Sequence, residues 1–308
     1  MRVVRLDPAP IVASVGTLTP LDEGVSGFDL AHASGDSPLR LRRMDRYQAL
    51  GFAAARLALS GCCERPSGKG DPEWGVILGS SLGCWGSNAQ YFDDLRRGTR
   101  SDLSPALFAR TVSNALNGEI TIEHQIGGVN ETLVSGWAAG GEALAEAGAI
   151  LADGRARFVL AGGVEAPDDT LRRLHAAPLA EAAGVCLLAA PDGIRESRRP
   201  RLLAYARGHD PPGRWSLWET LHALRPLSVG TVIIANTVPP DLLRRWKEEA
   251  GGVRVVVLPE WTGEIGAAGA PVAVAMVVAS ADGTDAVDGV LVIARGVEGG
   301  TAALALGP

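Results

Sequence analysis

One stretch near the middle of the chain has the composition of a nucleophile site. Residues 132–141 read Thr-Leu-Val-Ser-Gly-Trp-Ala-Ala-Gly-Gly and lie between an apolar strand pattern and an alanine-rich helix pattern. A strand that turns sharply into a helix, with small residues on both sides, presents a nucleophile in several enzyme folds. The amino end of a helix also stabilises a thiolate or an oxyanion. The residue at this turn is Trp137, which has no nucleophilic atom.

Ser135 is the other side chain of this stretch that carries a nucleophilic atom. A serine hydroxyl is a weak nucleophile unless a base lies beside it. His124 is the nearest histidine in the sequence, and no motif links it to Ser135. A lone serine in a strand is usually structural, and we interpret Ser135 in this way.

The cysteines do not form a metal-binding pattern. Cys62, Cys63, Cys84 and Cys186 lack a CxxC spacing and have no clustered histidines beside them, so a zinc site is not expected. Cys186 lies in an apolar strand pattern and is interpreted as a small core residue. The sequence therefore predicts no metal and no cofactor.

Composition excludes several classes of protein. The 308 residues are apolar overall and carry a net charge of −6, so the chain is a globular protein with no electrostatic support for nucleic-acid binding. The apolar run at residues 265–280 is too short for a membrane span and is rich in Gly and Ala. No signal peptide is visible at the start, and the cysteine usage favours a cytoplasmic location.

Strands alternate with helices along the sequence, which predicts a layered α/β fold. Strand patterns occupy residues 3–15, 74–79, 158–164, 184–190, 230–235 and 253–258, with a closing hairpin at 289–294 and 302–306. Helix patterns occupy residues 42–59, 88–97, 141–151, 216–224, 241–250 and 266–280, and a further segment covers 106–116. A basic link at 195–201 divides the chain into halves, 1–194 and 195–308. Both halves contain a strand, a turn and a helix of small residues, at Trp137 and at Gly266.

Six motifs in this order resemble those of the β-ketoacyl synthases, the condensing enzymes of the thiolase-like superfamily. The resemblance implies a five-layered fold, α-β-α-β-α, built from two similar halves and shortened relative to typical ketosynthases. It runs through most of the chain and rests on the following residues: Arg43–Arg46, Gly75–Gly83, Ser104–Asn114, Leu160–Val164, Gly263–Gly269 and Gly299–Thr301.

The resemblance also implies which positions should carry the chemistry. The family uses a cysteine thiolate at the helix amino end and two histidines that assist decarboxylation and stabilise the developing anions. The cysteine position here is Trp137, the second histidine position is Glu264, and the first histidine position is Asn236. The family's lysine appears as Pro259, and its gating phenylalanine appears as Glu298. Loss of every functional side chain, with the glycines kept, is typical of a catalytically silent relative.

Silent relatives of this kind act as partners of active enzymes. The chain resembles the chain-length factor, the non-catalytic half of a ketosynthase heterodimer in type II polyketide pathways. This resemblance implies an active ketosynthase subunit as the partner and a growing polyketide chain as the ligand of the complex. Acyl carrier protein would then meet this chain only through the partner, because the shortening removes parts of the substrate entrance.

Some positions are implied to reach the partner. In the chain-length factor, side chains on the helix after the glycine turn enter the partner's acyl tunnel, and a strand before the nucleophile position crosses the dimer. The alternative for the aromatic residues is that they fill the core of their own subunit. The tunnel or interface residues carried over by position are Trp85, Asn88, Phe92, Leu107, Phe108, Thr132 and Val134, with the crossing strand at Gly128–Ser135.

Two other functions remain open from the sequence. One is an acyltransferase or hydrolase with rebuilt chemistry on the same fold, and the other is a homodimeric, non-catalytic scaffold. Trp137 likewise has two interpretations: a plug that fills the vacated acyl pocket, or a wall of a ligand pocket. The face at Arg244–Lys247 is a further candidate for contact with a carrier protein or a partner.

Overall fold

The computed structural model describes residues 2–19, 30, 35, 41–98, 103–174, 179–194, 199–209, 229–249, 251–281, 289–296 and 299–308. The strands are β1 Arg2–Arg5, β2 Ile11–Leu18, β3 Trp74–Ser80, β4 Asn130–Val134, β5 Phe158–Glu165, β6 Ala182–Ala189, β7 Arg201–His209, β8 Thr231–Ile234, β9 Arg254–Val257, β10 Val290–Arg295 and β11 Gly300–Gly307. The α-helices are α4 Arg46–Ser60, α5 Trp85–Arg97, α6 Pro105–Phe108, α7 Ala115–His124, α8 Ala139–Ala152, α9 Asp169–Leu174, α11 Pro240–Glu249, α12 Pro259–Thr262 and α13 Gly269–Ala281. Two 3₁₀ turns, η2 Gly136–Ala138 and η3 Gly266–Ala268, precede α8 and α13.

The two halves repeat one sheet topology. Hydrogen-bonded strands follow the order β4-β3-β5-β6-β2-β7-β11-β10-β8-β9, with β1 paired to β7. In the first half β3 is parallel to β4 and β5, and β6 is antiparallel to β5 and β2. In the second half β8 is parallel to β9 and β10, and β11 is antiparallel to β10 and β7. The half-sheets meet where β2 pairs with β7 at Ile11 and Arg201.

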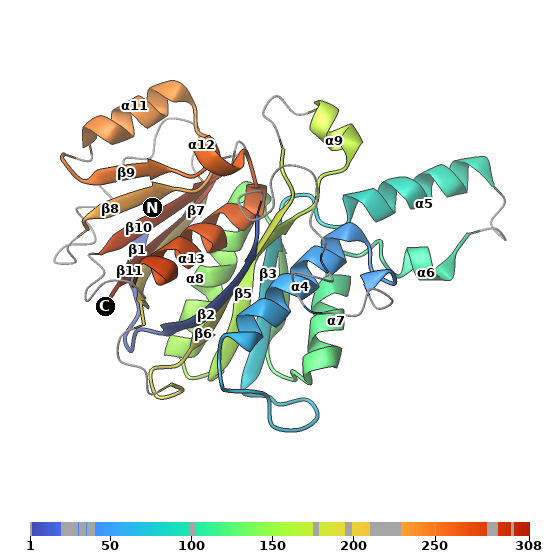
Figure 1. Ribbon diagram of the computed structural model, residues 1–308, viewed down its shortest axis with the longest axis horizontal. Helices are drawn as coiled ribbons and strands as arrows, with labels where there is room; N and C mark the ends of the chain where they lie inside the picture. The colour runs from blue at the N-terminus through green and yellow to red at the C-terminus, as the bar shows by residue number, and fades with distance from the viewer. Residues whose placement is uncertain are drawn as a thin grey trace.

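Helices cover both faces of each half-sheet, which produces a layered arrangement (Figure 1). α8 and α13 contact each other and the strands of both halves, so they form the middle layer. α4 packs against β2, β5 and β6 on one outer face. On the other outer face, Trp246 and Leu242 of α11 share a core cluster with Ile234 and Ile293. The predicted layered α/β fold, built from two similar halves, is thereby confirmed.

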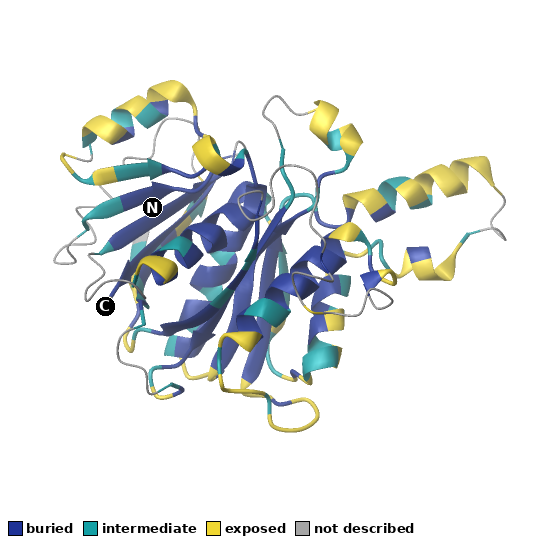
Figure 2. Ribbon diagram, in the orientation of Figure 1, coloured by how far each residue is buried: buried dark blue, intermediate teal, exposed yellow. Residues whose placement is uncertain are grey.

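Burial explains why the central strands form where they do. β3, β5 and β6 are buried along their whole length, and Figure 2 shows the dark core that they share with α4, α8 and α13. Such continuous burial fits the unbroken apolar runs of their sequences. α4 begins with a capping box: Gln48 N donates to Asp45 Oδ1 (2.8 Å), and Asp45 N donates to Gln48 Oε1 (3.1 Å).

Several elements differ from the sequence-based expectation. The pattern at 3–15 resolves into two strands, β1 and β2, which pair with different neighbours. The segment expected at 106–116 divides into α6 and α7, and α5 begins at Trp85 rather than Asn88. Strand β7 forms at Arg201–His209, where no strand was expected. Its buried residues are Leu202 and two alanines, which give only a weak alternation of apolar and polar side chains in the sequence. The helix expected at 216–224 lies outside the described residues.

No helix among the described residues is both long enough and apolar enough to cross a membrane.

Candidate functional site

The stretch around Trp137 forms a sharp connection between an edge strand and the central helix. β4 ends at Val134, Gly136 adopts a left-handed conformation (φ 78°), and η2 leads directly into α8. A positive φ is accessible to glycine at little cost, so Gly136 permits the turn. Trp137 is buried, with 6% of its surface exposed. The position expected to hold the nucleophile is therefore occupied by a packed indole ring.

Ser135 is held by a carboxylate on the helix that follows. Its hydroxyl donates to Glu142 Oε2 at 2.5 Å, which ties the end of β4 to the first turn of α8. His124 lies at the end of α7 and stacks on Phe52, with ring centroids 5.9 Å apart. The Ser135–Glu142 bond fits a structural role for the serine.

The two positions expected to hold histidines are in direct contact. Asn236 follows β8, and Glu264 follows α12. Asn236 Nδ2 donates to Glu264 Oε1 (3.0 Å) and to the carbonyl of Gly266 (2.8 Å). The backbone N–H of Gly266 also donates to Glu264 Oε1 (2.8 Å), and Thr237 N donates to Oε2 (2.6 Å). Both carboxylate oxygens are thus occupied by donors of the chain itself.

Burial makes this polar cluster rigid. Asn236 and Glu264 are 0% and 1% exposed, and buried polar groups of this kind are stable only when hydrogen-bonded. Asn236 Oδ1 accepts from Arg295 N at 3.2 Å, and the Arg295 guanidinium donates to Thr301 Oγ1 at 3.0 Å. The Asn236 amide is therefore fixed on both its donor and its acceptor side.

The two helix-leading turns pack on each other through glycine. A side chain at Gly140 would place its Cβ 1.9 Å from the carbonyl oxygen of Ala267, and one at Gly163 would place it 2.0 Å from the same oxygen. η3 consequently lies against the start of α8 and the end of β5. This packing brings Trp137 and the Asn236–Glu264 pair to one region, at the carboxyl ends of β3, β4, β5 and β8.

Sequence reasoning missed Glu165, a buried acid at the same edge. Its Oε1 accepts from Ser80 Oγ (3.2 Å) and from the backbone N–H of Ser81, whereas Oε2 has no partner among the described residues. Burial raises the pKa of the Glu165 carboxyl to about 7, and the hydrogen bonds oppose this only in part. The signal was present in the sequence, since Glu165 directly follows the buried Leu160–Val164 strand.

Glycine places η3 against this acid. Gly266 has φ +51°, and a Cβ there would lie 2.6 Å from Glu165 Cγ. Tyr47 lies on the other side, where its hydroxyl donates to the Ser113 carbonyl at 3.3 Å. Burial, and next the charge of Glu165, raise the pKa of the Tyr47 phenol. Glu165 therefore belongs to a buried polar region between η3 and α4.

The expected tunnel residues separate into exposed and inward-facing positions. Trp85, Phe92 and Phe108 are 42%, 60% and 58% exposed, so they do not fill the core of this subunit. Leu107 is buried, and Asn88 is half-buried with its amide donating to Cys84 Sγ (3.2 Å). In Figure 1, α5 and α6 project from the body of the molecule, and Figure 2 shows their largely exposed surface.

β4 is the terminal strand of the sheet. Its strand partner among the described residues is β3, and its burial pattern is that of a half-covered strand. The backbone N–H of Val76 on β3 donates to the carbonyl of Val129 (2.7 Å), which fixes the alternation of the β3–β4 ladder. Residues 129, 131 and 133 turn their backbone groups toward β3, so Asn130, Thr132 and Val134 turn theirs toward the open edge.

Exposed apolar side chains are concentrated on β4 and on the segments between β3 and β4. Among the described residues, most exposed large apolar side chains lie on α5, α6, α7, β4 and the loop before α7: Trp85, Phe92, Leu95, Phe108, Val112, Ile122 and Val134. Thr132 Oγ1 and Asn117 Oδ1 are buried and have no hydrogen-bond partner in the described part of the chain. An exposed apolar surface beside an unpaired strand edge marks an interaction site.

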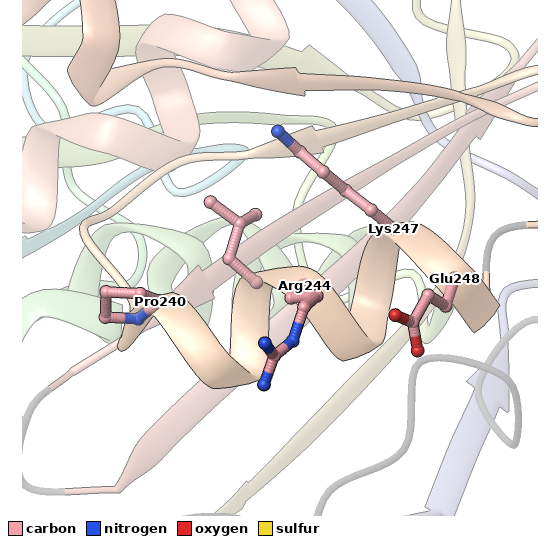
Figure 3. Close-up of a pocket in the computed structure, with 5 residues that line it drawn as sticks. Pro240, Arg244, Lys247 and Glu248 are labelled. Atoms are coloured by element: carbon pink, nitrogen blue, oxygen red, sulfur yellow. The ribbon is translucent and has the colours of Figure 1, made fainter.

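A separate shallow pocket of about 430 Å³ lies on α11 (Figure 3). Its described lining consists of Pro240, Leu243, Arg244, Lys247 and Glu248, all on this helix. The Arg244 side chain is paired with Asp241 at 3.0 Å. Among the residues described, no group of three or more His, Cys, Asp and Glu side chains is arranged to hold a metal ion.

Comparisons with known proteins agree with this architecture. The solved structure described as the ishigamide ketosynthase/chain length factor matches 97% of this chain and 99% of its own, with TM-score 0.79 and 19% identity. A second, described as AntDE:AntF, a type II PKS acyl-carrier protein in complex with its ketosynthase bound to the hexaketide, covers the same shares with TM-score 0.84 and 16% identity.

A sequence relative points the same way. The 3-oxoacyl-[acyl-carrier-protein] synthase 2 of Rhizobium meliloti (strain 1021) is 26% identical over 167 residues, which are 54% of this chain and 39% of the relative's length. The family profile described as "Beta-ketoacyl synthase, N-terminal domain" matches residues 7–194, more than half of the chain. The protein therefore belongs to the β-ketoacyl synthase family.

Proposed function

We propose that this protein is a catalytically silent, chain-length-factor-like subunit that pairs with an active ketosynthase and shapes its acyl tunnel. The observation that carries the proposal is the set of side chains at the family's three catalytic positions. Trp137 is packed, and Asn236 and Glu264 are locked to each other. The complex would act in type II polyketide biosynthesis, with chain length set at the shared tunnel.

The chemistry of condensation supports silence of this subunit. Acyl transfer needs a nucleophile, and the indole of Trp137 offers none. The enolate and oxyanion need hydrogen-bond donors aimed at the developing charge. Glu264 presents a hydrogen-bond acceptor instead, and its two oxygens already accept from Asn236, Gly266 and Thr237. A carboxylate in that position would oppose the developing negative charge.

The open edge of β4 supports pairing with a second subunit. An added strand would find the backbone donors and acceptors of Asn130, Thr132 and Val134 directed toward it. A partner would also provide groups near Thr132 Oγ1 and Asn117 Oδ1, each of which costs roughly 1–3 kcal/mol while buried and unpaired. Edge pairing would join the sheets of the two subunits, which explains why a silent subunit keeps the whole fold.

The exposed aromatic residues support the tunnel role. Trp85 and Phe92 lie on α5, and Phe108 lies on α6 with its ring 5.6 Å from the ring of Tyr91. Large apolar side chains of this kind are stable when a partner buries them. Placed in the partner's tunnel they would close it early and favour a short product. Carrier protein would meet the active subunit, as the ketosynthase–carrier complex among the structural relatives illustrates for that protein.

Co-expression with an active ketosynthase, one that keeps the family's cysteine and two histidines, tests the proposal. We expect size-exclusion chromatography to give a stable complex, and condensation to require both chains. A ketosynthase that is soluble, dimeric and fully active alone would refute the pairing role. An acyltransferase or hydrolase is tested separately by incubating the isolated chain with acyl-carrier substrates, since a covalent adduct in the mass spectrum would contradict silence. A stable, partner-free dimer would favour the homodimeric scaffold.

A further inference from the structure

The helices α5 and α6 form an arm that stands on a narrow base. Within α5, all of which the structure describes, Ser87 is the one buried side chain, and the helix packs chiefly against α6. Figure 2 shows how little of the two helices the body of the molecule covers. The direction in which the arm points therefore depends on the contacts at its base.

The two ends of the arm meet at this base. The chain enters α5 through Gly83 and Cys84, and Ser113 follows α6 on the way to α7. Cys84 Sγ lies 3.9 Å from Ser113 Oγ, and a Cβ at Gly83 would lie 2.6 Å from the same oxygen. Gly83, with φ +56°, permits this close approach at little cost. The entry and the exit of the arm are thus packed together.

The amino end of α4 holds both segments. The Tyr47 hydroxyl donates to the Ser113 carbonyl at 3.3 Å, and Ser87 Oγ donates to Asp45 Oδ2 at 2.5 Å. The other oxygen, Asp45 Oδ1, accepts from Gln48 N at 2.8 Å and caps α4. One carboxylate thereby joins the start of α4 to the first turn of α5. A hydrogen bond accepted by a carboxylate is stronger than one between neutral groups.

We propose that Asp45 and Ser87 form a clamp that fixes the direction of α5 and thereby sets product length. The clamp rests on the proposed function, in which aromatic side chains of α5 enter the partner's tunnel. Phe92 lies five residues beyond Ser87, which is roughly 8 Å along the helix axis. A small change of direction at the clamp therefore moves the Phe92 ring within the tunnel. Ser87 is a positioning residue, because it acts through Phe92 and needs no contact with the substrate.

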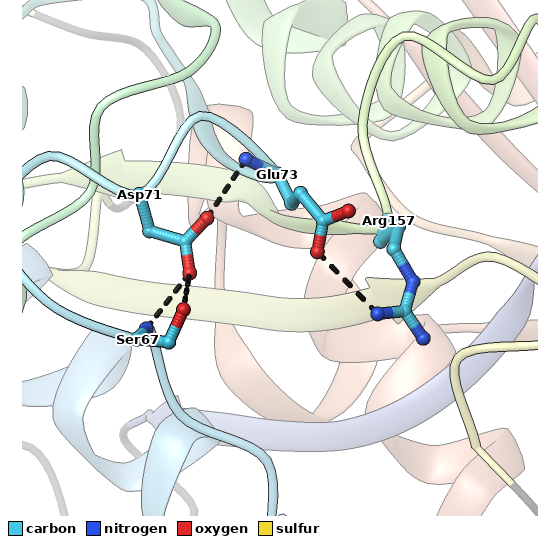
Figure 4. Close-up of polar contacts among 4 residues, drawn as sticks. All are labelled: Ser67, Asp71, Glu73 and Arg157. Carbon is cyan, nitrogen blue, oxygen red and sulfur yellow. Dashed lines mark hydrogen bonds and ion pairs between the residues drawn. The ribbon is translucent and has the colours of Figure 1, made fainter.

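Strand β3, from which the arm leaves, is itself fixed at both ends. At its start, Asp71 accepts from Ser67 N (2.7 Å), Ser67 Oγ (3.0 Å) and Glu73 N (3.0 Å), as Figure 4 shows. At its end, Ser80 Oγ accepts from Gly83 N at 2.7 Å. Since β3 is held in this way, a change in the direction of the arm has to arise after Gly83, where the clamp lies.

Mass spectrometry of the products of the assembled complex tests the clamp. Ser87→Ala removes the donor, and water can take its place at the half-buried Asp45, so the variant should fold and assemble. We expect a shift toward products longer by at least one extension unit, because a released α5 closes the tunnel less firmly. Ser87→Thr keeps the hydroxyl and should restore the native length. Ser60→Ala removes a serine hydroxyl that bonds to the Leu57 carbonyl at the other end of α4, and as the matched control it should leave the length unchanged.

Hydrogen–deuterium exchange on the isolated chain gives a second readout that needs no partner. Ser87→Ala should speed the exchange of the α5 amides and leave that of β3 and β5 unchanged, because only the base of the arm is released. Unchanged exchange in α5, or native product length from an assembled Ser87→Ala complex, would overturn the clamp.

Phe92→Ala in the same product assay separates the clamp from the proposed function. A longer product from Phe92→Ala beside an unchanged product from Ser87→Ala would overturn the clamp alone. Unchanged products from both variants, with the complex intact, would overturn the clamp and the tunnel role together.

Discussion

Glu165 is the side chain whose ionisation should matter most for stability. One of its oxygens is held by Ser80 and Ser81, the other has no described partner, and burial raises the pKa to about 7. An unfolded glutamate has a pKa of 4.5, so the folded state binds the proton more tightly. The protonated Glu165 carboxyl therefore contributes roughly 3 kcal/mol to the free energy of unfolding. This stabilisation is fully present below pH 4.5, decreases as the pH rises, and is lost above pH 7.

Thermal denaturation between pH 5 and pH 8 measures this effect. Glu165→Gln removes the titration and should flatten the decline in stability toward pH 8. Glu73→Gln, which changes an exposed carboxylate, serves as the matched control and should keep the decline. A Glu165→Gln protein that loses stability between pH 5 and pH 8 as steeply as the unmodified chain would contradict the assignment.

Trp137 should act as a packing residue. It is 6% exposed at the turn between β4 and α8, so Trp137→Ala leaves a cavity and should cost roughly 3–5 kcal/mol. Trp261→Ala, at a half-exposed tryptophan on α12, should cost far less. Urea denaturation of both variants makes the comparison. Equal losses would show that the indole does not plug the former pocket.

The sequence predicted which residues belong to the candidate site better than it predicted the contacts between them. Trp137, Asn236 and Glu264 were expected at one site because the resemblance to the ketosynthases assigns them to its three catalytic positions. That Asn236 and Glu264 bond directly to each other could not be predicted, since it depends on where β8 and α12 end in space. Glu298, the position of the family's gating phenylalanine, lies outside the described residues. The roles of the tunnel residues stay predictions.

Among the elements, β4 offers the sharpest test of subunit pairing. The N–H of Thr132 points to the open edge, so Thr132→Pro removes a donor needed by an added strand and spares the β3–β4 ladder. We expect this variant to stay folded and to lose the complex. Leu133→Pro removes a donor directed at β3 and should instead destabilise the fold.

Size-exclusion chromatography with the ketosynthase, beside circular dichroism of the isolated variants, separates the two outcomes. A Thr132→Pro chain that is folded and still forms the complex at unchanged affinity would remove the β4 edge from the interface.

α5 carries the prediction on product length. Phe92→Ala or Trp85→Ala should lengthen the product of the complex, because each removes an exposed aromatic group from the tunnel. Gln90→Ala, an exposed polar position on the same helix, should leave the product unchanged. Mass spectrometry of the products gives the chain length. Unchanged length with intact assembly would exclude these aromatic residues from gating.

The elements were predictable where burial is continuous. β3, β5 and β6 could be predicted from unbroken apolar runs, α4 and α11 from helical periodicity, and α8 and α13 from runs of small and apolar residues. β7 was missed because small alanines weaken its alternation, although it pairs with β11, β1 and β2. The local sequence therefore predicts continuously buried strands and helices well. It predicts poorly a strand such as β7, which connects the two half-sheets.

In the whole molecule, the repeat of two half-folds explains how a site can be lost while the fold is kept. Each half places a turn and a helix of small residues in the middle layer, η2 with α8 and η3 with α13. Close glycine contacts, such as Gly140 against Ala267, hold these turns together through backbone packing. The division into residues 1–194 and 195–308 stays a prediction. Strand β1 of the first half pairs with β7 of the second, so the sequence boundary does not separate all the strands of the two half-sheets.

We expect this chain to be required for condensation and to perform none of the chemistry itself. The direct measurement uses the purified complex, in one case with the active ketosynthase and in the other with a ketosynthase whose nucleophilic cysteine is replaced by alanine. We predict product from the first complex and none from the second, with assembly equal in both. Condensation product from the complex with the inactivated ketosynthase would contradict the account.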